Sequence, residues 1–131
     1  MLLDMYNRNT EKPVFYEIDA FDINPNVIET ACQGIYNQRS LREDGSCFSY
    51  VSDLYLKKND NKVYVEQELR NNIHFFVHNL LHELRPDYYD VIFFRNAFIY
   101  ILPDYRERVL TNLSNALKES GFLITGISET A

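Results

Sequence analysis

Three polar residues directly follow apolar segments of this chain. Asp22 comes after residues 14–21, Asn79 after residues 73–77, and Arg95 after residues 90–94. If these segments are parallel strands, their carboxyl ends share one edge of a sheet, where open α/β sheets bind ligands. A carboxylate there can accept hydrogen bonds from both hydroxyls of a ribose. Asp22 could instead cap a following helix, and both interpretations stay open at this point.

Strands that alternate with helices would position these groups. The β-branched and aromatic run VFYEIDAF at 14–21 predicts a buried strand, and Pro25 suits the first turn of a helix that ends near Gly34. An apolar stripe predicts a helix over 105–119, with Gly121 as its end. The remaining expected strands are 73–77, 90–94 and 122–125. This alternation predicts an α/β fold with a parallel sheet.

The middle of the chain has a different pattern. Residues 48–69 alternate polar and apolar residues around the polar loop 57–62, and a strand resumes at 63–65. A solvent-facing β-hairpin fits, because Asn and Asp tolerate the positive φ angles of such turns. Residues 80–84 predict a short helix or turn. We therefore expect one domain over 1–131, with a small inserted β-subdomain at about 48–69.

Composition narrows the function classes. The chain has 131 residues, 13 Lys plus Arg against 19 Asp plus Glu, and a formal net charge of −6. This acidity argues against nucleic-acid binding. No segment approaches the length of a membrane span, and the start of the chain turns acidic too soon for a secretory signal. Two cysteines are too few for a disulfide framework, which predicts a reduced, cytoplasmic protein.

Several residues suggest chemistry that their context does not support. His74, His78 and His82 have helical spacing, but 73–77 is an expected strand, so we predict no metal site. Cys32 falls on the apolar side of the first predicted helix and is expected in the core. Cys47 lies in a loop without an activating base. The sequon that begins at Asn112 lies within a predicted helix and is read as accidental.

Four segments carry a resemblance to a known family. They are residues 21–31 with 34–36, residues 76–81 (FVHNLL), residues 89–100 (YDVIFFRNAFIY) and residues 121–129 (GFLITGISE). In order and spacing they resemble the CheR-type chemotaxis receptor methyltransferases over essentially the whole chain. The resemblance implies a Rossmann-like sheet and an S-adenosylmethionine-dependent enzyme. Such an enzyme methylates glutamate side chains of chemoreceptors and leaves S-adenosylhomocysteine.

The resemblance also implies roles for five cofactor-binding residues. Asp22 would hold the ribose hydroxyls, Asn79 and Leu80 would border the adenine, and Phe94 and Arg95 would line the cofactor. Phe94 stands where the family commonly has cysteine. That change is conservative if the position contributes mainly its backbone.

Catalysis and partners follow from the same match. Tyr100 corresponds to the tyrosine near the transferred methyl group, where its phenol would position the incoming carboxylate. The expected partners are the cytoplasmic helices of a chemoreceptor or its tail peptide. The peptide would dock on the β-subdomain by strand addition.

The family's glycine-rich loop, first sheet strand and helical N-terminal domain have no counterpart in these residues. We therefore expect an incomplete methyltransferase domain, in which strand 14–21 and strand 90–94 are not direct neighbours. A homodimer or a segment outside this sequence would fill the gap, or the two strands would pair directly. The alternative function is a non-catalytic interaction module that keeps the methyltransferase scaffold. A phospho-accepting receiver fold is weaker, since the lysine it needs after a late strand is missing.

Overall fold

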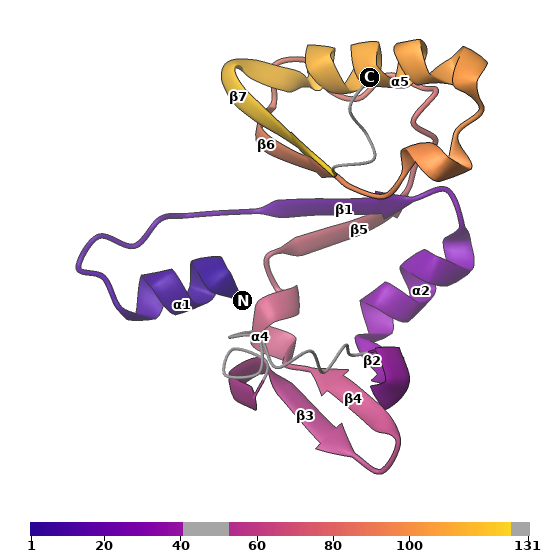
Figure 1. The fold of residues 1–131 in the computed structure, drawn as a ribbon. Helices are drawn as coiled ribbons and strands as arrows, with labels where there is room; N and C mark the ends of the chain where they lie inside the picture. Colours follow the sequence, from indigo (N-terminus) through magenta and orange to yellow (C-terminus); the bar gives the residue numbers. More distant parts are fainter. Residues whose placement is uncertain (41–52, 127–131) are drawn as a thin grey trace. The chain divides into compact units, whose positions relative to one another are not determined.

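A computed structural model describes residues 1–40 and 53–126 of the chain. The chain divides into two compact units, Met1–Val77 and His78–Ala131, and each is described here by itself. Both contain a pair of parallel strands with helices, so the protein has a mixed α/β fold (Figure 1).

The elements follow one another in a mixed order along the chain. In the first unit they are α1 (Leu2–Arg8), β1 (Ile18–Asp22), α2 (Pro25–Gln33), β2 (Ile35–Asn37), η1 (Gln38–Ser40), β3 (Leu56–Asn59), β4 (Lys62–Val65), α4 (Gln67–Arg70) and β5 (Ile73–Val77). In the second they are β6 (Tyr89–Phe94), η2 (Phe98–Tyr100), α5 (Pro103–Ala116) and β7 (Leu117–Thr125). No helix in the described ranges is long and apolar enough to cross a membrane.

β1 and β5 form a parallel pair in register from Ile18 opposite Ile73 to Asp22 opposite Val77. The strand expected from residue 14 begins only at Ile18. The reason is that Asn7 of α1 binds both backbone groups of Val14, with N···O distances of 2.8 and 2.9 Å. The backbone at Val14 is thereby tied to the helix rather than to a neighbouring strand.

α2 follows β1 with a cap at each end. The side chain of Asn24 accepts a hydrogen bond from the backbone N–H of Asn26, and Pro25 occupies the first turn. Gly34 ends the helix with a φ of +64°. A Cβ at Gly34 would also meet Cδ of Arg70 at 2.8 Å. Glycine is therefore required there both by the backbone and by the close approach of Arg70.

The antiparallel sheet of the first unit has the order β2-β4-β3. β3 and β4 are the arms of a hairpin, and Asp60 in its turn has a φ of +52°. The sequence did not suggest β2, a three-residue strand that pairs with β4 directly after α2. Part of the expected subdomain, together with Cys47, lies outside the described residues.

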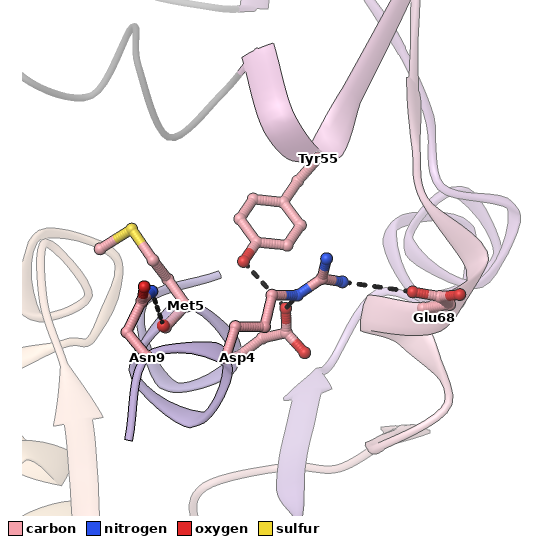
Figure 2. Close-up of polar contacts among 6 residues, drawn as sticks. Asp4, Met5, Asn9, Tyr55 and Glu68 are labelled. Carbon is pink, nitrogen blue, oxygen red and sulfur yellow. Dashed lines mark hydrogen bonds and ion pairs between the residues drawn. The ribbon is translucent and has the colours of Figure 1, made fainter. Parts of the chain in front are cut away.

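A polar cluster connects α1 to the segment before β3 and to α4 (Figure 2). The hydroxyl of Tyr55 donates to Oδ2 of Asp4 at 2.8 Å, and Nε of Arg8 donates to the same oxygen at 2.7 Å. Arg8 also pairs with Glu68 at 3.3 Å. Desolvation raises the pKa of Asp4, but the bonds from Tyr55 and Arg8 outweigh it and hold the pKa below the ordinary carboxyl value. Burial and the bond to Asp4 raise the pKa of Tyr55.

In the second unit, α5 covers one face of the parallel pair β6–β7. Phe94 and Phe98 pack edge to face against one another, and Val109 and Leu113 of α5 complete the buried cluster. The other face of the pair is apolar but exposed. Its members are Val91, Phe93, Phe122 and Ile124. The strand expected to be buried on both sides is therefore covered on one.

The last helix ends earlier than the sequence predicted. α5 stops at Ala116, because the carbonyls of Asn115 and Ala116 accept hydrogen bonds from the backbone N–H groups of Asp87 and Tyr88. Leu117 then pairs with Tyr89 as the start of β7. Gly121, expected to end the helix, lies within β7 next to an irregularity in the register.

Candidate functional site

Asp22 is the last residue of β1, at the carboxyl end of the first parallel pair. Its Oδ1 accepts a hydrogen bond from the backbone N–H of Asn24 at 2.8 Å. The helix cap is Asn24, so the interpretation of Asp22 as the cap of α2 is wrong. Within the described residues, Oδ2 of Asp22 has no hydrogen-bond partner. One carboxylate oxygen thus orders the turn, and the other can accept hydrogen bonds from a ligand.

Asn79 and Leu80 lie in a turn that follows β5. The backbone N–H of Leu81 donates to Oδ1 of Asn79 at 3.0 Å, and that of His82 donates to the Asn79 carbonyl at 2.8 Å. Leu80 packs against the buried cluster under α5. The segment expected as a short helix or turn is therefore a turn, in which the Asn79 side chain is already engaged.

Asn112 of α5 binds the backbone of this turn. Its side chain is only 8% exposed, and its Nδ2 donates to the carbonyls of Leu80 at 2.8 Å and of His82 at 3.2 Å. The sequence analysis treated Asn112 only as an accidental sequon. A signal was present, because Asn112 lies on the apolar stripe between Val109 and Leu113, where a polar side chain needs a buried partner.

Phe94 and Arg95 end β6. Phe94 is buried, with its ring packed against Phe98, so its side chain belongs to the core rather than to an open site. Arg95 is exposed, and Asn96 after it has a φ of +57°, which turns the chain toward η2. Asparagine tolerates this left-handed conformation better than most residues.

Tyr100 ends η2 and is 85% exposed. Arg106 of α5 supports this segment, because its guanidinium donates to the carbonyls of Phe98 and Ile101, each at 3.2 Å. Sequence reasoning did not identify Arg106, since nothing in the sequence shows that it reaches back to η2. The phenol of Tyr100 is therefore exposed to solvent, at the end of a segment that Arg106 stabilises.

The structure also bears on the predictions made for Cys32 and for the three histidines. Cys32 is exposed, so its predicted place in the core is wrong, although its carbonyl accepts a hydrogen bond from Arg70 at 2.5 Å. The reason is that α2 has no fully buried residue. His74 lies on β5, while His78 and His82 follow it outside any helix, so their spacing does not place them on one helical face.

Within the second unit, one buried cluster connects three segments. They are the turn at Asn79 and Leu80, the end of β6, and α5. Asp22 belongs to the first unit. Each unit is therefore described by itself: the first offers a carboxylate oxygen that can accept hydrogen bonds, and the second offers a leucine packed on an apolar cluster.

A family model described as "CheR methyltransferase, SAM binding domain" matches residues 1–131. The chain belongs to this family. S-Adenosylmethionine is the cofactor of such a domain.

The chain is also similar to several curated CheR-type proteins. It is 29% identical to "Putative methyltransferase Cher3" of Pseudomonas putida, over 92% of this chain and 45% of that protein. It is 29% identical to "Chemotaxis protein methyltransferase" of Borreliella burgdorferi, over 99% of this chain and 46% of that protein. The Salmonella typhimurium protein of the same name is 32% identical over 89% of this chain and 42% of its own length. The chain thus spans less than half the length of these relatives.

Proposed function

We propose that the protein to which these residues belong transfers a methyl group from S-adenosylmethionine to glutamate side chains of a chemoreceptor. The available Oδ2 of Asp22 at the end of a parallel strand is the observation that carries the proposal. Family membership and relatives named as chemotaxis methyltransferases support it. The expected product besides the methyl ester is S-adenosylhomocysteine, and the expected compartment is the cytoplasm.

Different residues of this chain would bind different parts of the cofactor. Asp22 would accept hydrogen bonds from the ribose hydroxyls, while Asn79 and Leu80 would border the adenine. Phe94, through its backbone, and Arg95 would line the rest of the cofactor. When bound, S-adenosylmethionine supplies an electrophilic methyl group on a sulfonium.

Tyr100 would act on the acceptor. Its exposed phenol can donate a hydrogen bond to the incoming glutamate carboxylate and hold one oxygen in line with the methyl group. Methyl transfer needs the carboxylate in its ionised form, so a donor that orients it without protonating it suits the reaction. Tyr100 is the residue that we assign to catalysis.

Receptor recognition is proposed for the sheet β2-β4-β3. β3 is an outer strand of that sheet, and its Lys57 and Lys58 are exposed. A receptor tail peptide could add to such an edge through backbone hydrogen bonds. We further propose that β1–β5 and β6–β7 are parts of a Rossmann-like fold, and that about 48–69 form its inserted β-subdomain.

Calorimetry on the intact protein tests the proposal against the non-catalytic alternative. Titration with S-adenosylhomocysteine should release heat with micromolar affinity, and S-adenosylmethionine with purified receptor should yield base-labile methyl esters. A protein that binds neither compound but still binds the receptor tail peptide would be an interaction module on a methyltransferase scaffold.

A further inference from the structure

The turn that contains Asn79 and Leu80 is short and lies between two regular elements. Its own hydrogen bonds are local, from Leu81 and His82 back to Asn79. Such bonds define the shape of the turn, but they do not attach it to the rest of the second unit. Attachment requires contacts with residues distant in sequence.

Asn112 supplies a polar attachment. One Nδ2 group donates to two carbonyls of the turn, those of Leu80 and His82, at 2.8 and 3.2 Å. These partners lie 32 and 30 residues away from Asn112 in the chain. Because Asn112 is almost fully buried, its amide depends on these two carbonyls for its hydrogen bonds.

We infer that Asn112 is a positioning residue of the cofactor site, whose buried amide fixes the turn carrying Asn79 and Leu80 onto α5. The inference rests on the proposed function, since it takes Asn79 and Leu80 to border the adenine. Apolar packing of Leu80 on the cluster under α5 also contributes to the attachment, but it lacks the directionality of a hydrogen bond. The two directed hydrogen bonds from Asn112 additionally set the position of the turn along α5.

Matched substitutions on one helix test this role. Asn112→Asp keeps the shape of the side chain but replaces the donor with an acceptor, and Asn112→Ala removes it without a new charge. Asn115→Asp and Asn115→Ala are the controls, because Asn115 lies in the same helix but is exposed. Thermal melting of each variant of the intact protein establishes that it folds.

Two measurements then report on the turn and on the site. In the ligand-free protein, the amide hydrogens of Leu81 and His82 should exchange about tenfold faster in the Asn112 variants than in the controls. Affinity for S-adenosylhomocysteine should fall about tenfold. The KM for S-adenosylmethionine should rise similarly, while kcat at saturating cofactor and the KM for receptor stay within twofold of wild type.

The results that would contradict the inference differ from the result that would contradict the proposed function. Folded Asn112 variants that exchange and bind like the Asn115 controls would overturn the inference and leave the proposed function standing. Faster exchange with unchanged affinity would overturn it too, because the turn would then move without consequence for the cofactor. A wild-type protein that binds no S-adenosylhomocysteine would instead overturn the proposed function, and with it a cofactor role for Asn112.

Discussion

Asp22 and Asn24 share one turn after β1 but contribute to different properties. Asn24 satisfies a backbone N–H at the start of α2, which is a contribution to stability. Asp22 uses one oxygen to order the turn and keeps the other available. The two residues therefore offer a way to separate folding from ligand binding at the same place in the chain.

Asp22→Asn should weaken S-adenosylhomocysteine binding by about 1.5 to 3 kcal/mol, as expected for a lost charged hydrogen-bond partner. The amide oxygen of the new side chain can still accept from Asn24, so stability should change little. Asn24→Ala is the control and should lower the free energy of unfolding by about 1 kcal/mol without affecting affinity. Calorimetry and denaturant unfolding measure the two effects, and unchanged affinity in Asp22→Asn would remove Asp22 from the site.

Tyr100→Phe removes only the phenol oxygen of a residue that is already exposed. The melting temperature should therefore stay unchanged, since surface substitutions away from special features have small effects. The kcat for receptor methylation should fall by about tenfold, consistent with a lost orienting hydrogen bond. Initial rates at saturating cofactor measure this, and a rate equal to wild type would show that the phenol does not touch the acceptor.

Among the elements, α1 is seven residues long and has no buried residue. A helix this short is not stable by itself in water. Its position in the first unit depends on the packing of Met5 against Tyr55 and Leu69. It also depends on the polar cluster in Figure 2, in which Asp4 accepts from both Tyr55 and Arg8. The attachment of α1 should therefore depend in part on the ionisation of Asp4.

Acidification should weaken the attachment of α1. The pKa of Asp4 is lower in the folded protein than in the unfolded chain, so its contribution is present at neutral pH. That contribution is lost as the pH falls from the ordinary carboxyl value, about 3.9, through the lowered folded value. Unfolding measured by denaturant between pH 7 and pH 2 should lose this part of its pH dependence in Asp4→Asn. An identical pH profile for the variant and wild type would contradict the prediction.

β7 contains a close approach of the backbone at Gly121. A Cβ at Gly121 would lie 3.0 Å from the carbonyl oxygens of Lys118 and Tyr89. Gly121→Ala should therefore destabilise the protein by about 1 to 3 kcal/mol, the usual cost of overpacking. Ser120→Ala, at the neighbouring exposed position, should change stability by less than about 0.5 kcal/mol. Equal midpoints for the two variants in urea would show that the strand relaxes freely around Gly121.

At the scale of the whole molecule, the exposed apolar face of β6–β7 is the feature that calls for a partner. Phe93 and Phe122 on this face are 74% and 68% exposed. Contiguous apolar surface of this kind marks an interaction site on a protein. We expect a second copy of the chain to cover this face.

The isolated chain should therefore self-associate through this face. Light scattering after size exclusion should give twice the mass of one chain at micromolar concentration. The double variant Phe93→Lys and Phe122→Lys should shift it toward the monomer, while Lys57→Ala and Lys58→Ala on the hairpin should not. A wild-type chain that stays monomeric at all concentrations would contradict the prediction.

The sequence by itself was sufficient for features governed by local chemistry. Periodicity located α2 and β5, Pro25 and Gly34 marked the ends of α2, and the Asn-rich segment marked the hairpin turn. The position of Asp22 at the end of a strand was also evident, because it depends only on where an apolar run stops. The resemblance to the CheR family rested on motifs, which are likewise local, and the family match confirmed it.

Tertiary structure decided whatever depends on contacts between distant residues. α5 ends at Ala116 because Asp87 and Tyr88 donate to its last carbonyls, and β1 begins late because Asn7 binds Val14. Asn112 looked like a surface sequon until its amide was seen to bind a turn about thirty residues away. The physical reason is common to all three: a hydrogen bond between remote segments can outweigh a local preference of comparable size, and no local pattern records it.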